Sequence, residues 1–254
     1  MNAVRRRTIQ CLTTDLKLEN LCVVLVSTRN PLNIGASARA MSNFGASQLR
    51  LVNPFDASFR EARSAVGAAE LLKRAQEFSS LPDGIADCSL VVGTTAARAR
   101  ELHQPMRTLP EAAPLIRQHL AVGKVAVLFG SEKRGLSNDD LNHCHWLLHI
   151  PTREQHLSMN LGQAVAVCVY EIVRSATTQT RSTETKPATA AELERLSELL
   201  LESLTASGYL KPNARKSSED RVRRLVRRLQ FSSDDAEELL GMLRKIAWKL
   251  DRGI

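Results

Sequence analysis

Short apolar runs recur along this chain, and segments with helical periodicity lie between them. The first run, residues 21–26, is apolar at every position and has the length of a β-strand. Similar runs occupy residues 49–52, 90–94, 125–129 and 146–150, and helices are expected over residues 34–44, 61–78, 110–121, 139–143 and 160–174. A wholly apolar run suits a parallel strand that is covered on both faces. The alternation therefore predicts an α/β fold, with a parallel sheet and helices on both faces.

The cysteines, histidines and N-terminal arginines give no sign of a metal, a disulfide framework or a membrane. The five cysteines are widely spaced and include no Cys-x-x-Cys pair, which favours a reducing compartment. His143-Cys144-His145 resembles a ligand set, but neighbouring residues on one backbone seldom converge on one metal, so we interpret it as the lead-in to a strand. No long apolar stretch follows the arginines at residues 5–7. We expect a cytoplasmic protein with no membrane partner and no metal.

The composition changes after residue 174. Residues 175–190 contain no large apolar side chain and are interpreted as a linker. Beyond them, residues 191–206, 220–229 and 234–250 have helical periodicity with leucine stripes, and Ser233 is expected to cap the last helix. The sequence thus predicts a core domain of residues 1–174, a linker of residues 175–190, and a small helical, basic C-terminal extension of residues 191–254.

Positive charge is concentrated in that extension. The whole chain has a formal net charge of +8, and residues 211–228 contain eight Lys or Arg against two acidic residues. Arg221, Arg224 and Arg228 follow i, i+3, i+7 spacing, which places them on one face of a helix. A solvated polar face is one interpretation. Contact with the phosphates of a nucleic acid is the other, and the local excess of charge favours it.

Small residues mark the ends of three predicted strands, in residues 93–96, 129–131 and 150–152. Residues 130–137 have the Gly-x4-Gly spacing of a phosphate loop, but Leu136 stands where such a loop needs lysine. No Gly-x-Gly-x-x-Gly follows the first strand, so an ATPase and a dinucleotide-binding protein are both disfavoured. Open α/β sheets bind ligands at the carboxyl ends of their strands. Backbone groups there, with residues 156–159, are suited to hold an adenine.

Three segments near these strand ends carry a recognisable pattern. In the first, five residues separate Asn33 from Arg39. The second contains, in order, Phe129-Gly130, Glu132 and Gly135-Leu136. The third contains Ser158, Met159 and Asn160 before an apolar helix that ends near Tyr170-Glu171. Together, over about residues 20–174, they resemble the signature motifs of the TrmH-type SPOUT RNA 2′-O-methyltransferases.

Two further features resemble the TrmJ branch of that family: the strand end at residues 91–96 and the Leu/Arg-rich C-terminal part. The continuation Ala97-Arg98 departs from the branch, where the arginine comes one residue earlier. This branch methylates the ribose 2′-hydroxyl at anticodon-loop position 32 of tRNA. The resemblance therefore implies an S-adenosylmethionine-dependent tRNA methyltransferase that forms a homodimer. It also implies that the C-terminal part of the α/β domain forms a trefoil knot.

The resemblance assigns roles to individual residues. The expected catalytic residues are Arg39, Asn33, Ser158 and Asn160. The expected cofactor-binding residues are Thr94, Thr95, Ala96, Gly130, Glu132, Ile150, Leu157, Ser158 and Met159. Three roles stay open for Arg39: a bidentate grip on an RNA phosphate, stabilisation of the developing alkoxide, and general-base action, which needs an unprotonated guanidinium.

Structural roles and other functions compete with these assignments. Asn33 could cap the helix that follows it, and Ser158 or Asn160 could cap the long apolar helix, for which Ser158 is chemically reasonable. Glu132 could hold its loop by accepting backbone N–H groups. The same motifs would also serve a 2′-O-methyltransferase that acts on rRNA or on another position of tRNA. A non-catalytic RNA-binding protein of the same fold is the alternative from a different class. The joint presence of the four expected catalytic residues speaks against it.

Overall fold

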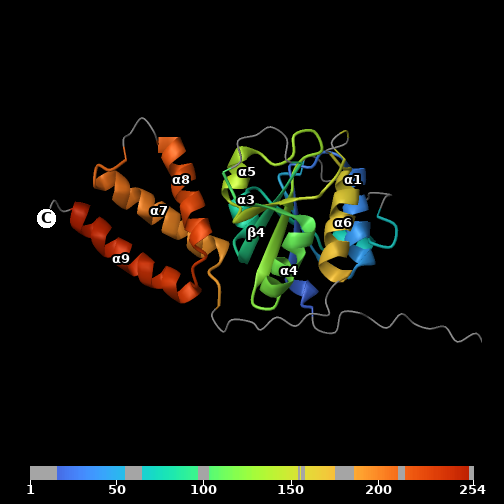
Figure 1. Ribbon diagram of the computed structural model, residues 1–254, viewed down its shortest axis with the longest axis horizontal. Helices are drawn as coiled ribbons and strands as arrows, with labels where there is room; N and C mark the ends of the chain where they lie inside the picture. Colours follow the sequence, from blue (N-terminus) through green and yellow to red (C-terminus); the bar gives the residue numbers. More distant parts are fainter. Residues whose placement is uncertain are drawn as a thin grey trace, which may run out of the picture.

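The computed structural model describes residues 16–54, 65–96, 103–153, 155, 158–174, 186–210 and 215–251. Its centre is a seven-stranded sheet of order β3-β2-β1-β6-β4-β7-β5, in which every neighbouring pair is parallel. The strands are β1 (Leu21–Val26), β2 (Gln48–Val52), β3 (Gln76–Phe78), β4 (Cys88–Thr95), β5 (Met106–Thr108), β6 (Lys124–Phe129) and β7 (Trp146–His149). Helices flank the sheet, and three more follow it in the chain (Figure 1). The predicted α/β class is confirmed.

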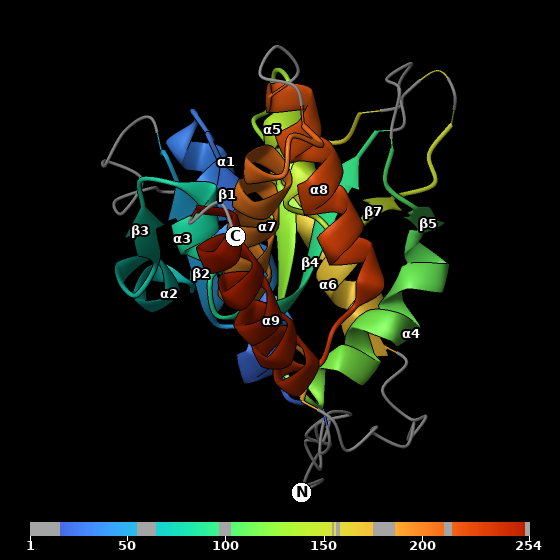
Figure 2. The same cartoon turned by 90° about the vertical axis from the view of Figure 1, so that its left-hand side faces the viewer.

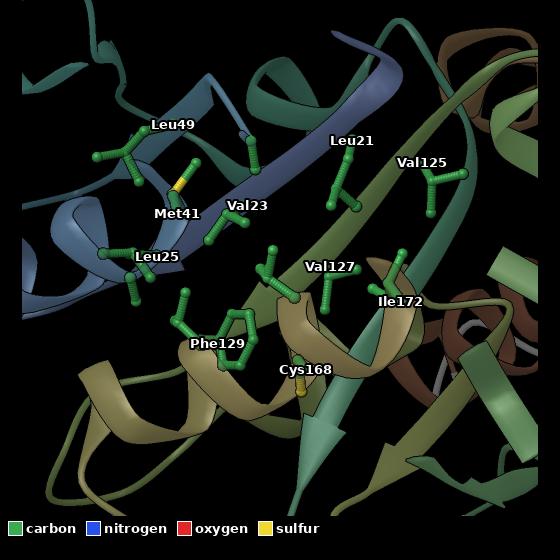
Figure 3. Close-up of a cluster of buried hydrophobic side chains, with 14 of the residues drawn as sticks. Leu21, Val23, Leu25, Met41, Leu49, Val125, Val127, Phe129, Cys168 and Ile172 are labelled. Atoms are coloured by element: carbon green, nitrogen blue, oxygen red, sulfur yellow. The ribbon is translucent and has the colours of Figure 1, made fainter. Parts of the chain in front are cut away.

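One face of the sheet is covered by α1 (Pro31–Asn43), α2 (Ala69–Lys73), α4 (Leu109–Leu120) and α6 (Leu161–Arg174). Leu21, Val23 and Leu25 of β1 pack in one buried cluster with Met41 of α1 and Ile172 of α6 (Figure 3). Successive residues of a strand point to opposite faces, so the other residues of β1 must be buried elsewhere.

The opposite face is covered by α3 (Leu81–Ile85), α5 (Asn138–Asn142) and the start of α7 (Ala190–Ala206). Cys22 and Val24 of β1 pack there in a cluster with Ile85 of α3, Leu141 of α5 and Ala190 of α7. Burial on both faces is the physical reason why the first run is apolar at every position, and it confirms that prediction.

α7, α8 (Arg215–Leu229) and α9 (Ser233–Asp251) form a group of helices beside this second face (Figures 1 and 2). They share a buried cluster that includes Leu193 of α7, Val226 of α8 and Leu240 of α9. The N–H of Ala191 donates a hydrogen bond to the carbonyl of Ala86 at 3.0 Å, at the end of α3. α7 therefore takes part in two cores and attaches the helical group to the sheet.

A partly buried carboxylate also fixes α8 in place. Glu194 of α7 accepts hydrogen bonds from Nη2 of Arg223 at 2.8 Å and from Nη2 of Arg227 at 3.2 Å. Its carboxylate lies 3.6 Å from Nδ1 of His143, directly after α5. Arg227 is only 1% exposed. A buried guanidinium is tolerated only where it is paired and hydrogen-bonded, so Glu194 is the group that permits the burial of Arg227.

The edges of the sheet differ from the sequence-based expectation. A helix was expected over 61–78, but among its described residues only Ala69–Lys73 (α2) is helical, and Gln76–Phe78 forms β3 beside β2. Residues 55–64 lie outside the described part. The sequence also did not indicate the short elements α3 and β5. Three-residue edge strands are specified by pairing with a neighbour, and they are too short to carry a periodic pattern of their own.

Two helix caps also differ by a few residues. The cap of α1 is Asn30, whose side chain accepts a hydrogen bond from the N–H of Leu32 at 3.0 Å; Asn33 is not the cap. At α9 the hydroxyl of Ser232 accepts a backbone N–H in the first turn, one residue before the predicted Ser233. The side chain of Asn33 is consequently free for another contact.

Within the described ranges, no helix combines the length and apolar character that crossing a bilayer requires. Among the same residues, no group of three or more His, Cys, Asp or Glu side chains is placed to hold a metal ion. The trefoil knot implied by the resemblance stays a prediction.

Candidate active site

The carboxyl ends of β6, β4 and β7 lie next to one another in the sheet. Thr95 of β4 is in register with His149 of β7, and the hydroxyl of Thr94 donates to the carbonyl of Leu128 in β6 at 2.8 Å. Gly130 directly follows β6, and Ile150, which is partly buried, directly follows β7. The structure thus brings together the strand ends that the sequence marked with small residues.

The loop after β6 leaves no space for a side chain at Gly130. A Cβ atom there would lie 2.0 Å from the carbonyl carbon of Gly135 and 2.1 Å from the nitrogen of Leu136. The N–H of Gly135 donates to the carbonyl of Ser131 at 2.8 Å, and Gly135 has a φ of 68°, in the left-handed region. The loop therefore folds back on itself, and the strand end at Gly130 is lined by backbone.

Hydrogen bonds connect the three motif segments. Oε1 of Glu132 accepts from Nδ2 of Asn33 at 2.8 Å, and Oδ1 of Asn33 accepts from Nδ2 of Asn160 at 3.1 Å. Oε1 and Oε2 of Glu132 also accept the N–H groups of Asn30 and Arg29, each at 3.4 Å. Burial alone would raise the pKa of Glu132, but these hydrogen bonds outweigh it and lower the pKa. Glu132 is therefore a stable anion that orients the amide of Asn33, and a weak proton acceptor.

α6 begins against α1 with little space between them. Oδ1 of Asn160 accepts the N–H of Gly162 at 3.0 Å, so the capping role is confirmed for Asn160 and is wrong for Ser158. A Cβ on Gly162 would lie 2.7 Å from Cβ of Ala36, so glycine is needed where the two helices meet. This close approach is what allows Asn160 to reach Asn33.

The remaining candidates lie apart from this network. Arg39 is exposed on α1 and makes no hydrogen bond or ion pair with the described residues. It lies about 9 Å along the helix from Asn33, at 1.5 Å per residue. Ser158 is exposed, Met159 is partly buried, and Leu157 lies outside the described residues.

Two threonines at the same edge of the sheet have polar atoms without a partner. The hydroxyl groups of Thr28, after β1, and of Thr152, after β7, are buried and make no hydrogen bond with the described residues. A buried hydroxyl without a partner costs free energy, so both are candidates for contact with a ligand. Thr28 was not among the site residues predicted from the sequence. Its position just after the apolar run of residues 21–26, at the end of a predicted strand, could have indicated it.

The chain belongs to the SpoU methylase family. The model of the SpoU rRNA Methylase family matches residues 20–170, which is more than half of the chain. This match covers the sheet strands and all three motif segments. The resemblance seen in the sequence is therefore confirmed.

Curated relatives and solved structures agree with that family. The chain is 36% identical over 235 residues to "tRNA (cytidine/uridine-2'-O-)-methyltransferase TrmJ" of Sodalis glossinidius, covering 90% of this chain and 92% of the relative. It is 36% identical over 252 residues to "tRNA (cytidine/uridine/adenosine-2'-O-)-methyltransferase TrmJ" of Pseudomonas aeruginosa, covering 93% and 97%. The crystal structure of TrmJ from Z. mobilis is similar with a TM-score of 0.78 and 32% identity, covering 89% of this chain and 98% of that one. The similarity includes the C-terminal helices.

Proposed function

We propose that this protein transfers a methyl group from S-adenosylmethionine to a ribose 2′-hydroxyl of tRNA, at anticodon-loop position 32. The observation that carries the proposal is the Glu132–Asn33–Asn160 network, which unites the three family motifs beside adjacent strand ends. Relatives of nearly the same length are named as tRNA 2′-O-methyltransferases, which supports tRNA as the substrate. The enzyme would act in the cytoplasm, where tRNA is found.

The strand ends fit the proposed methyl donor. S-adenosylmethionine supplies a methyl group already activated on a sulfonium. Gly130 exposes its backbone at the end of β6, where there is no space for a side chain. Thr152, whose buried hydroxyl has no partner among the described residues, follows β7 at the same edge of the sheet. The residues proposed to hold the donor are Thr94, Thr95, Ala96, Gly130, Ile150, Leu157, Ser158 and Met159, with Glu132 positioning the loop.

Arg39 is proposed to act on the RNA. A guanidinium stays protonated at neutral pH, so it is suited to grip a phosphate or to stabilise the oxygen that loses its proton. Because Arg39 has no partner among the described residues, its donors are available for the RNA. Asn33, Asn160 and Ser158 are proposed to position the ribose.

A homodimer is proposed to form through the outer faces of α1 and α6. Leu32 of α1 and Tyr170 of α6 are 55% and 51% exposed, and Val167 of α6 is also exposed. Exposed apolar side chains on the outer faces of two packed helices are typical of an interface. Leu32 and Arg39 are seven residues apart and lie on one helix face, so such a dimer would place Arg39 at the boundary between the two chains.

The proposed division of labour assigns catalysis to residues 1–174 and RNA binding to residues 191–254, with residues 175–190 as the linker. The separate buried cluster of α7, α8 and α9 and the arginines of α8 support it.

Incubation with labelled S-adenosylmethionine and unmodified tRNA, followed by nucleoside mapping, tests the function. We expect one 2′-O-methylated nucleotide at position 32. Label in rRNA or at another tRNA position would support the alternative substrate. RNA binding without any label, and without binding of the donor in a calorimetric titration, would support a non-catalytic RNA-binding protein.

A further inference from the structure

A basic cleft of about 370 Å³ lies between α8 and the residues that lead into β5 and β7. Arg221, Arg224 and Arg228 line it from α8, and Gln104 and His145 line it from the sheet side. α8 runs along the outside of the second face of the sheet (Figure 2). The cleft is separate from the candidate active site, because His145 precedes β7 and Ile150 follows it. A four-residue strand spans about 13 Å.

The arginines of α8 fall into two sets. Arg223 and Arg227 share Glu194 as an ion-pair partner, as described above. Arg221 and Arg228 are exposed and form no ion pair with the described residues. Arg224 donates through Nη1 to Oδ1 of Asn142 at 2.9 Å, which fixes its guanidinium but leaves its charge uncompensated. The described lining of the cleft therefore contains three arginines and no carboxylate.

The inner wall of the cleft adds a hydrogen-bond donor. Nδ1 of His145 accepts the N–H of Val91 at 3.1 Å. Burial and the charge of Arg227 lower the pKa of His145 to about 3, so the ring is neutral and its hydrogen is on Nε2. Arg227 lies behind this wall, with Nε and Nη1 buried and without a partner among the described residues. Nε2 of His145 and the three arginines of the lining donate hydrogen bonds, and an anion with several acceptor oxygens would accept them.

We propose that this cleft binds consecutive backbone phosphates of the RNA substrate. The three arginines extend over about 10 Å of α8, which is longer than one phosphate group and suits a nucleic acid strand. Leu225, which is 41% exposed between them, offers an apolar contact for a sugar. The described lining contains no Phe, Tyr or Trp on which a base could stack, so the contact would position the RNA without reading its sequence. This inference rests on the proposed function for the identity of the RNA.

The distance between the cleft and the carboxyl ends of the strands determines which part of the RNA the cleft would bind. The bound phosphates belong to nucleotides other than the methylated one, because about 13 Å of strand separates the two places. The cleft would thus act as a second grip that fixes the orientation of the RNA relative to the methyl donor. Loss of this grip should raise KM for RNA more than it lowers kcat.

The first test compares Arg221→Ala and Arg228→Ala with the matched control Arg244→Ala, which removes an exposed arginine of α9 that has no described partner. The dissociation constant for unmodified tRNA is measured at several KCl concentrations. Each cleft variant should weaken binding about tenfold and reduce the slope of log Kd against log salt by about one. The control should change neither. Equal effects in all three variants, or none in the cleft variants, would overturn the proposal.

The second test locates the phosphates. An anticodon-arm RNA is synthesised with one neutral methylphosphonate at each position in turn, and its affinity is measured for the unmodified protein and for Arg228→Ala. A neutral linkage at a gripped phosphate should weaken binding to the unmodified protein but not to the variant. If every position weakens both proteins equally, no individual phosphate is gripped and the proposal is wrong.

The two proposals fail in distinguishable ways. A protein that methylates tRNA normally, with cleft variants that bind tRNA like the control, would refute the cleft and leave the enzyme function intact. A protein that shows the cleft-dependent RNA affinity but transfers no methyl group would refute the enzyme function and leave the cleft intact.

Discussion

Replacement of Glu194 by alanine should loosen the packing of α8 against α7. The side chain of Glu194 is 17% exposed and pairs with Arg223 and with the almost fully buried Arg227. Without it, Arg227 would be a buried cation with no carboxylate partner among the described residues. Such a change costs about 3–5 kcal/mol of folding free energy. We therefore expect Glu194→Ala to lose that amount of stability and to weaken RNA binding as strongly as the cleft variants do.

The same carboxylate predicts a pH dependence. Burial would raise the pKa of Glu194, but the nearby ring of His143 and the hydrogen-bonded guanidinium of Arg223 lower it from its ordinary value near 4.5 to about 2. A carboxyl group whose pKa is lowered on folding stabilises the fold above the ordinary pKa, and that contribution disappears as the pH falls toward the folded value. We expect the unmodified protein to lose on the order of 2–3 kcal/mol between pH 5 and pH 2 from this group.

Urea unfolding followed by circular dichroism and tryptophan fluorescence measures both effects. The chain has two tryptophans, Trp146 in β7 and Trp248 in α9, so one reports on the sheet and the other on the helical group. Glu198→Ala is the control, because Glu198 is exposed one turn further along α7. The reasoning is refuted if Glu194→Ala loses less than about 1 kcal/mol, or if the control loses as much.

Three further predictions concern the active site and the core. Arg39→Ala should lower methyl transfer by at least about 100-fold with an unchanged melting temperature, and near-native turnover would contradict the proposed role. Gly130→Ala should abolish binding of S-adenosylmethionine, because the added Cβ would overlap the backbone of Gly135. A calorimetric titration measures this loss, and the circular dichroism spectrum should stay native. Normal affinity for S-adenosylmethionine would exclude this loop from the donor site. Asp87→Asn should destabilise the fold by about 3 kcal/mol in urea unfolding, because buried Arg50 would lose the carboxylate that it contacts at 2.6 Å; a loss below about 1 kcal/mol would contradict that pairing.

Much of the fold could be predicted because its strands are buried on both faces. Burial on both sides requires an apolar residue at every position, as at residues 21–26, and such a run is visible without any partner. The edges could not be predicted in the same way. Gln76–Phe78 is largely exposed and becomes a strand only because β2 offers backbone groups to pair with.

The active-site candidates were recognised as motifs, but their contacts were not. The sequence pattern indicated Asn33, Glu132 and Asn160 individually, at separations of 99 and 127 residues along the chain. Whether an amide acts as a helix cap or as a link between loops depends on which groups the fold brings near it. Asn30 took the capping role, which left Asn33 to join Glu132 to Asn160.

The sequence by itself determined which side chains must leave water and which segments belong to a methylase, because apolar periodicity and motif spacing are properties of the chain. Only the tertiary structure decided which arginines of α8 form ion pairs and which line the cleft. Periodicity placed Arg221, Arg224 and Arg228 on one face. Only the position of Glu194 shows that Arg223 and Arg227 form ion pairs, while those three line the cleft. A charge acquires its role from the groups within a few ångströms of it, and those groups come from distant parts of the chain.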